Sequence, residues 1–242
     1  MASAASPISG GDLNRRCSCR RLGQQNPAIA AKDSGRYSFR VKRNKLVRDN
    51  DGWKTLSSES HFANSHVDVR TEQVQTPTRP QPFTWTVVRR KAAVIVAPMT
   101  RDGKIVLIRQ ERVPIRAAIW EMPAGQIDNS GEAKENEIEA VALRELREEA
   151  GYELAKDGEV TALGHYFSSP GFTDEHGYFF LARPVESSAG YSRDETESIV
   201  DCRAFSAEEL RRMIAENEIR DANTLTMCAQ LAAHGFLSLD PR

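Results

Sequence analysis

The sequence has few cysteines and no long apolar run, and both absences restrict what the protein can be. Among 242 residues there are four cysteines: a close pair, Cys17 and Cys19, and two isolated ones, Cys202 and Cys228. This arrangement provides no disulfide framework and indicates a reducing compartment, for which we predict the cytoplasm. No apolar stretch reaches the roughly 18 residues that a membrane-spanning helix requires, so we expect no contact with a membrane.

The chain also has almost no net charge, at −1 overall, which gives no support for a nucleic-acid-binding surface. The charge is unevenly distributed, because residues 1–48 contain eleven Lys or Arg and two Asp. This basic leader has few large apolar residues and no period, so we predict that it is disordered. Three interpretations stay open: an organellar transit peptide, a flexible tail, or sequence upstream of the true start.

Patterned sequence begins near Trp53, and we predict a β-strand region at 53–90 followed by one domain at 91–242. In the first region, Val67, Val69 and Val74 alternate for the most part with polar residues, which is typical of a half-buried strand. A proline-rich turn separates this strand from a second β-rich run, FTWTVVRR.

The larger region contains β-rich runs and three helical stretches. The first helix, NEIEAVALRELREEAG, ends at Gly151, a residue suited to a helix C-cap. A capping box formed by Ser206 and Glu209 predicts the start of the second, and Asp221 the start of the third. The predicted strands are KAAVIVAPM, KIVLIRQERV, VTALGHYF, GYFFLARPV and SIVDCRAF. This order predicts an α+β sandwich, a sheet with helices packed on it.

Three glutamates of the first helix lie on one side. At about 100° per residue, Glu145, Glu148 and Glu149 share an arc of about 100°, while Leu146 and Ala150 face the core. Like charges on one arc repel each other, and a bound divalent cation would relieve that repulsion through oxygen ligands. The alternative is an ordinary solvated helix face.

The segment from Arg144 to Tyr152 resembles the second half of the Nudix box, Arg-Glu-U-x-Glu-Glu-x-Gly-U with U apolar, at every fixed position. The first half is five residues longer than the family pattern, because Gly125 is followed by six residues, Glu132, and eleven more before Arg144. We therefore expect a longer loop before the helix. The first Glu of the box is one of three residues: Glu132, Glu135 or Glu137.

Two further segments resemble the ADP-ribose and ADP-sugar pyrophosphatases of the Nudix family. They are RQERVPIRAAIWEMPAGQID and YFSSPGFTDEHGYFFLA. The resemblance covers the chain from about Trp53 to the C-terminus. It implies a Nudix-type α/β/α sandwich with a mixed sheet. It also implies hydrolysis of the diphosphate bond of ADP-ribose or a related ADP-sugar, with Mg²⁺ or Mn²⁺, to give AMP and a sugar phosphate.

The resemblance assigns the metal to the acidic helix. It implies that Glu145 and Glu149 are metal ligands and that the Ala124 carbonyl completes the shell. Glu148 is a third ligand or, alternatively, a charge beside the site. Arg144 is implied to orient these glutamates with its guanidinium donors, the alternative being a surface ion pair.

In the same pyrophosphatases the general base is a Glu on a later loop, which implies Glu195 or Glu197 here. Glu175, in the Ser-Pro-Gly-Phe loop, is a weaker candidate of the same kind and is expected near the substrate.

For the substrate, Arg112 matches the substrate-binding arginine of the family, and Arg109 is a second candidate to hold phosphate oxygens. Glu121 is expected to face the site in a role that stays open. Trp53, Phe83 and Trp85 are available to stack on adenine, but we expect them to be core or interface residues. Each of the polar candidates has a solvated surface position as its alternative.

The resemblance also implies a homodimer, in which the strands of 53–90 pack against the partner. Two other functions stay open. One is the same chemistry on a GDP-sugar, a dinucleoside polyphosphate or an oxidised nucleotide. The other is a non-hydrolytic nucleotide- or RNA-binding module, which the intact glutamates Glu145, Glu148 and Glu149 disfavour.

Overall fold

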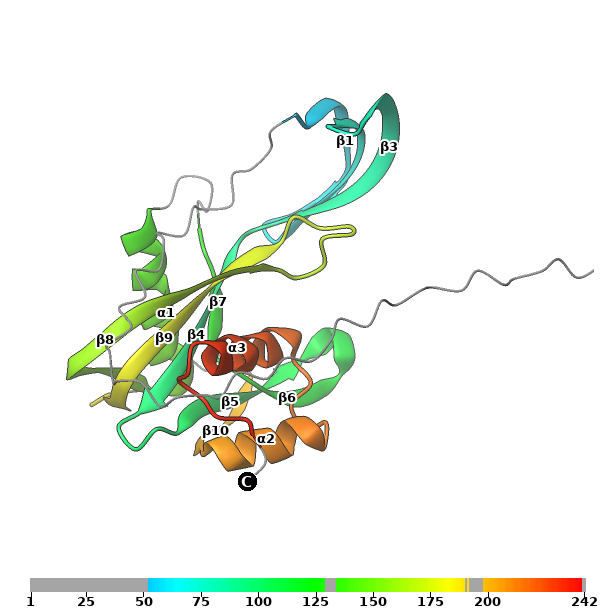
Figure 1. Ribbon diagram of the computed structural model, residues 1–242. Helices are drawn as coiled ribbons and strands as arrows, with labels where there is room; N and C mark the ends of the chain where they lie inside the picture. Colours follow the sequence, from blue (N-terminus) through cyan, green and yellow to red (C-terminus); the bar gives the residue numbers. More distant parts are fainter. Residues whose placement is uncertain (1–51, 129–133, 190, 192–197, 241–242) are drawn as a thin grey trace, which may run out of the picture. The chain divides into compact units, whose positions relative to one another are not determined.

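The computed structural model describes residues 52–128, 134–189, 191 and 198–240 (Figure 1). These residues form a three-stranded sheet, a seven-stranded sheet and three α-helices. The predicted base candidates Glu195 and Glu197, the box candidate Glu132 and the basic leader 1–48 lie outside the described residues.

The three-stranded sheet is antiparallel and consists of β1 (Lys54–Ala63), β2 (Val67–Thr76) and β3 (Arg79–Arg90). The alternating valines of β2 are half-buried, as their pattern predicted. Strand β1 was not predicted, because all ten of its residues are exposed and it is held by backbone pairing with β2. A strand of this kind needs no apolar period, so its sequence carries no signal.

The seven-stranded sheet has the order β10-β5-β4-β9-β8, with β6 paired to β5 and β7 paired to β4. The central pair β4 and β9 is parallel and the other pairs are antiparallel, so the sheet is mixed, as predicted. The strands are β4 (Ala93–Thr100), β5 (Ile105–Arg112), β6 (Ala117–Glu121), β7 (Ala124–Gln126), β8 (Tyr152–Phe167), β9 (His176–Ser187) and β10 (Ile199–Phe205). A 3₁₀ turn, Val113–Ile115, joins β5 to β6.

Helices cover both faces of this sheet (Figure 1). Helix α1 (Glu135–Ala150) packs on one face through Ile138, Ala142 and Leu146. Helices α2 (Ala207–Ala215) and α3 (Ala222–Ala233) pack on the other. Because β4 and β5 present alternate residues to the two cores, the described chain is an α/β/α sandwich, which confirms the predicted fold class.

The helix ends follow the local signals. Gly151 ends α1 with a φ of 71°, a left-handed conformation that glycine adopts without strain. The Ser206 hydroxyl accepts a hydrogen bond from the Glu209 amide at 3.3 Å, and the Asp221 carboxylate accepts one from the Thr224 amide at 2.7 Å. Among the helices in the described residues, none combines the length and apolar character needed to cross a membrane.

Candidate active site

A cleft of about 750 Å³ opens beside the main sheet. Its walls come from β4, the end of β5, β6, β7, helix α1, the turn between β8 and β9, and the start of α3. Segments far apart in the sequence therefore contribute to one site. The residues predicted from the sequence that line it are Arg112, Glu121, Ala124, Arg144, Glu145, Glu149 and Glu175.

The acidic arc of α1 divides into a buried and an exposed part. Glu145 and Glu149 line the cleft with only 5% and 3% of their surface exposed. Glu148 is exposed and is not part of the cleft lining. Because Leu146 and Ala150 occupy the core behind them, the buried glutamates are fixed between the sheet and the cleft. A solvated helix face would not bury two carboxylates in this way.

Arg144 contacts two of these glutamates. Its guanidinium donates to Glu145 Oε1 and to Glu148 Oε2, each at 2.5 Å. Burial lowers the pKa of Arg144, but the charges of Glu145 and Glu148 outweigh this and hold the pKa above its usual value. Arg144 thus binds Glu145 in the cleft and Glu148 outside its lining, an arrangement that fits the orienting role predicted for it.

Strand β7 contacts helix α1 at the cleft. The Ala124 amide donates a hydrogen bond to Glu149 Oε2 at 2.7 Å. At Gly125 a Cβ atom would collide with the carboxylate of Glu145, so only glycine leaves room for that side chain. Gly125 therefore packs against the helix in space, although it is distant from Glu145 in the sequence.

The cleft contains oxygen atoms of the kind that the divalent cation implied by the Nudix box would require. Hard cations take oxygen ligands, and the cleft offers the carboxylates of Glu145 and Glu149 beside the Ala124–Gly125 backbone. In addition, the buried Oε1 of Gln110 in the same cleft accepts no hydrogen bond from the described residues. No group of three or more His, Cys, Asp or Glu arranged for a metal occurs in the described part of the chain. Two carboxylates with further oxygen donors nearby fit a hydrated cation.

Arg112 and Glu121 form a bidentate pair across β5 and β6. Arg112 Nε donates to Glu121 Oε1 at 2.9 Å, and Nη2 donates to Oε2 at 2.5 Å. Glu121 is 4% exposed, and its hydrogen bond raises the pKa of Arg112. The role left open for Glu121 is thereby defined in structural terms: it holds the Arg112 guanidinium at the cleft wall.

Arg109 lies elsewhere. It is exposed on β5 and does not line the cleft, whereas the next three residues of the chain, 110–112, do. Its predicted phosphate contact therefore has no support from the described geometry.

Glu175 reaches the cleft from the turn between β8 and β9. Its carboxylate accepts a hydrogen bond from the Ser168 hydroxyl at 2.6 Å and forms an ion pair with Arg90 at 2.9 Å. Arg90 also lines the cleft. The predicted position of Glu175 near the site is therefore consistent with the geometry.

The cleft residues that sequence reasoning missed include Arg90, Gln110, Tyr166 and Asp221. Burial, with the charge of Glu175 adding to it, raises the pKa of Tyr166 well above its usual value, so its phenol stays protonated. Asp221 was predicted as the start of a helix but not as a residue of the cleft. Nothing in the local sequence of the other three distinguishes them from ordinary strand residues.

The α/β/α sandwich thus has one helix that carries two buried glutamates into a polar cleft. The family follows from direct comparison: residues 88–227 match the model of the NUDIX domain. The chain belongs to the NUDIX family, and it is a Nudix hydrolase.

Individual relatives agree with this assignment. The chain is 32% identical over 171 residues to an ADP-ribose pyrophosphatase of Bacillus subtilis, covering 71% of this chain and 88% of the relative. It is 33% identical over 175 residues to a methanol dehydrogenase activator of Bacillus methanolicus, with the same two coverages. A GDP-mannose pyrophosphatase of Klebsiella pneumoniae is 33% identical over 164 residues, covering 62% of this chain and 75% of the relative.

A solved structure of an ADP compounds hydrolase superposes with a TM-score of 0.60 at 19% identity, covering 78% of this chain and all of that one. At that identity the likeness shows the fold.

Proposed function

We propose that the protein hydrolyses the diphosphate bond of ADP-ribose or a related ADP-sugar, giving AMP and a sugar phosphate. The observation that carries the proposal is the pair of buried glutamates, Glu145 and Glu149, in a cleft that also contains arginines. A diphosphate carries clustered negative charge, so its hydrolysis requires that this charge be neutralised. The relative named ADP-ribose pyrophosphatase supports the choice of substrate.

The cation would be Mg²⁺ or Mn²⁺, held by Glu145 and Glu149, with the Ala124 carbonyl as a further ligand and Glu148 as a third carboxylate or a nearby charge. When bound, it supplies charge neutralisation at the diphosphate and lowers the pKa of water. The chain's own contribution is to hold these oxygens in place. Arg144 orients Glu145 and Glu148, while the Ala124 amide fixes Glu149.

Arg112 would bind phosphate oxygens, oriented by its hydrogen bonds to Glu121. The general base would be Glu195 or Glu197. Their segment leads into Ser198, which lines the cleft and whose carbonyl accepts a hydrogen bond from the Glu111 amide at 2.9 Å. That contact ties the end of the segment to β5 beside the site.

A GDP-sugar is the second candidate substrate, favoured by the similarity to the GDP-mannose pyrophosphatase. The Ser-Pro-Gly-Phe segment, residues 169–172, favours the adenine compounds instead, because it resembles that of the ADP-sugar enzymes. We further propose that the protein acts in the cytoplasm as a homodimer assembled through residues 53–90. The exposed edge strand β1 supports this assembly, since an unpaired strand edge invites pairing with another chain.

The test is turnover of a panel containing ADP-ribose, ADP-glucose, GDP-mannose and ATP with Mg²⁺, with products separated by chromatography. ADP-ribose should give AMP and ribose 5-phosphate at the highest kcat/KM. A clear preference for GDP-mannose would move the assignment to the second candidate, and a preference for ATP would reject both.

A further inference from the structure

A buried carboxylate occupies an unusual place in the three-stranded sheet. Among the residues of β1, β2 and β3, only Glu72 is buried, with 3% of its surface exposed. An unpaired carboxylate at such a site would be strongly unfavourable, so it requires a charged partner. A sheet that buries one acid and no apolar residue is organised around an ionic contact.

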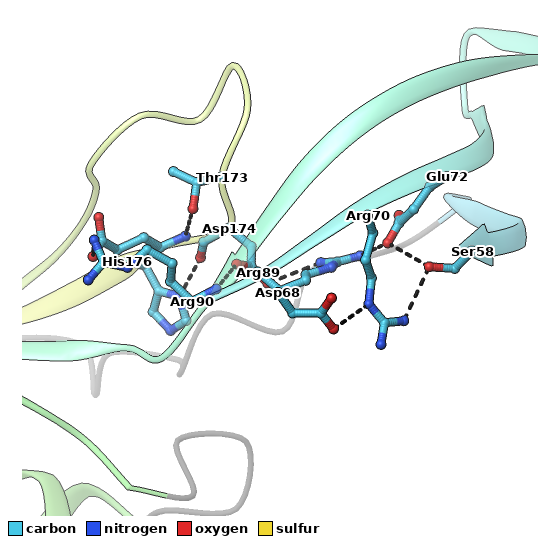
Figure 2. Close-up of polar contacts among 10 residues, drawn as sticks. Ser58, Asp68, Arg70, Glu72, Arg89, Arg90, Thr173, Asp174 and His176 are labelled. Atoms are coloured by element: carbon cyan, nitrogen blue, oxygen red, sulfur yellow. Dashed lines mark hydrogen bonds and ion pairs between the residues drawn. The ribbon is translucent and has the colours of Figure 1, made fainter. Parts of the chain in front are cut away.

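The partner of Glu72 is Arg89, and Arg89 has a second partner outside the sheet. Its Nη2 donates to Glu72 Oε1 at 2.7 Å, and its Nη1 donates to Asp174 Oδ2 at 3.0 Å (Figure 2). Burial lowers the pKa of Arg89, but its hydrogen bonds to Glu72 and Asp174 raise it by more. One guanidinium therefore joins β2 to the turn between β8 and β9.

The same turn runs alongside β3. The Val88 amide donates to the Phe172 carbonyl at 2.8 Å, and Trp85 Nε1 donates to the Gly171 carbonyl at 3.1 Å. Asp174 also accepts a hydrogen bond from the Arg90 amide at 2.9 Å (Figure 2). Backbone contacts thus place the turn against the strand, and Asp174 receives both a side-chain and a main-chain donor there.

The next residue reaches the catalytic cleft. Glu175 follows Asp174 directly, lines the cleft and pairs with Arg90 at 2.9 Å. Neighbouring side chains Asp174 and Glu175 are therefore held by neighbouring arginines, Arg89 and Arg90. Any displacement of Asp174 must pass to Glu175 through a single peptide unit.

We propose that Arg89 and Asp174 are positioning residues that fix Glu175 in the cleft, with buried Glu72 as the anchor on the sheet. The proposal rests on the proposed function, because it assigns Glu175 a part in that reaction. It gives the N-terminal sheet a role within each subunit's own site. Arg89 and Asp174 act through Glu175, and neither is assigned contact with the reacting atoms.

The test measures kcat and KM with the best diphosphate substrate of the wild-type protein, using full-length variants with Mg²⁺. Asp174→Asn keeps the pair between Glu72 and Arg89 intact and weakens only the contact with the turn. Both Asp174→Asn and Arg89→Ala should lower kcat about 10-fold. Arg89→Lys, which keeps the positive charge, should lower kcat by less. The matched control is Arg70→Ala, since Arg70 pairs with Asp68 at 2.6 Å and donates to the Ser58 hydroxyl at 3.2 Å on the same sheet (Figure 2). It reaches Glu72 only through Ser58, whose hydroxyl is 3.4 Å from Glu72 Oε1, and it does not contact the turn. Its kcat should stay within about twofold.

The decisive comparison uses Glu175→Gln. If Arg89 and Asp174 act through Glu175, Asp174→Asn should cause no further loss of kcat in the Glu175→Gln background. Additive losses, or a Glu175→Gln variant with normal turnover, would overturn the proposal. If the substitutions acted only by destabilising the fold, their effects on kcat would be additive and the melting temperature would fall.

Hydrogen exchange gives a second readout that does not depend on activity. Backbone amides of residues 168–176 should exchange faster in Arg89→Ala and Asp174→Asn than in Arg70→Ala. Equal exchange in all three variants would also overturn the proposal. If the wild-type protein hydrolyses no diphosphate, the proposed function fails, while this measurement still decides whether Arg89 and Asp174 hold the turn.

Discussion

Glu145 and Glu149 occupy positions that would be unfavourable without specific partners. Burial of an ionised carboxylate costs roughly several kcal/mol after relaxation of the protein. Arg144 offsets part of this cost at Glu145, and the Ala124 amide does so at Glu149. The absence of a side chain at Gly125 leaves space for Glu145. Two carboxylates buried at one cleft are the basis of the metal site proposed above.

Replacing Glu149 with Gln should abolish most activity and leave the fold intact. The change keeps the volume and the acceptor oxygen for the Ala124 amide but removes one charge from the proposed metal site. We expect kcat/KM to fall by about 100-fold or more, with an unchanged circular dichroism spectrum. Glu139→Gln, on the same helix but outside the cleft lining, is the control. Near-normal turnover of Glu149→Gln at saturating Mg²⁺ would show that the ligands are misassigned.

Glu195→Gln and Glu197→Gln separate the two candidates for the general base. The variant that lacks the base should lose kcat at neutral pH and regain part of it as the pH rises, because hydroxide then replaces the activated water. Loss of the other residue should leave the pH profile of kcat unchanged. Parallel profiles for both variants and the wild-type protein would exclude both residues.

Among the cleft residues, those that lie close together in the sequence could be predicted from it. Glu145 and Glu149 could be found because both lie on one helix, whose period is visible in the sequence. The pairing of Arg112 with Glu121 was not predictable, since it depends on how β5 and β6 align. Tyr166 and Asp221 reach the cleft only through the packing of distant elements, so no short segment identifies them.

The start of α3 is tied to the connection between β6 and β7, just before Ala124 and Gly125. The Thr224 hydroxyl accepts a hydrogen bond from the Met122 amide at 2.9 Å and donates one to Asp221 Oδ2 at 2.7 Å. Thr224 is fully buried, so these bonds are shielded from water. The helix cap therefore also holds the chain just before the cleft wall.

Thr224→Val should destabilise the protein by about 1–3 kcal/mol, because it keeps the side-chain shape and leaves the Met122 amide without its acceptor. The free energy of unfolding, measured with a chemical denaturant, checks this. Thr226→Val is the matched control, since the exposed Thr226 hydroxyl donates to the Ala222 carbonyl within the same helix. Equal stability of the two variants would contradict a structural role for the Thr224 hydroxyl.

Elements with an apolar period or a clear cap were predictable, and the others were not. The three helices start or end at Gly151, Ser206 and Asp221, as their local sequences indicate. In contrast, β6 and β7 are short strands defined by their partners, and β8 begins at Tyr152, within a charged segment before the predicted VTALGHYF. Pairing with β9 determines that extension, and such pairing has no local signature.

For the whole molecule, the unusual part is the exposed N-terminal sheet. Large apolar side chains on it are about half exposed, including Trp53, Leu56, Phe62 and Trp85. A homodimer that buries this sheet would cover these side chains and the exposed edge strand β1. The exposed apolar side chains of this region would then be buried between two subunits.

Removal of residues 1–48 should leave both assembly and activity unchanged, because that segment has too little apolar content to join a core. Removal of residues 1–90 should cost both, since it deletes the proposed interface together with Arg89 and Arg90. Light scattering at micromolar concentration and turnover of ADP-ribose are the two measurements. An active monomer of the full chain would refute the homodimer.

The central claim is metal-dependent hydrolysis of a diphosphate by the cleft that Glu145 and Glu149 line. The most direct test follows ADP-ribose turnover by chromatography while Mg²⁺ is removed with a chelator and then restored. The account predicts AMP and ribose 5-phosphate with Mg²⁺, a loss of activity with excess chelator, and recovery when Mg²⁺ is added back. Equal turnover of ADP-ribose in excess chelator would contradict it.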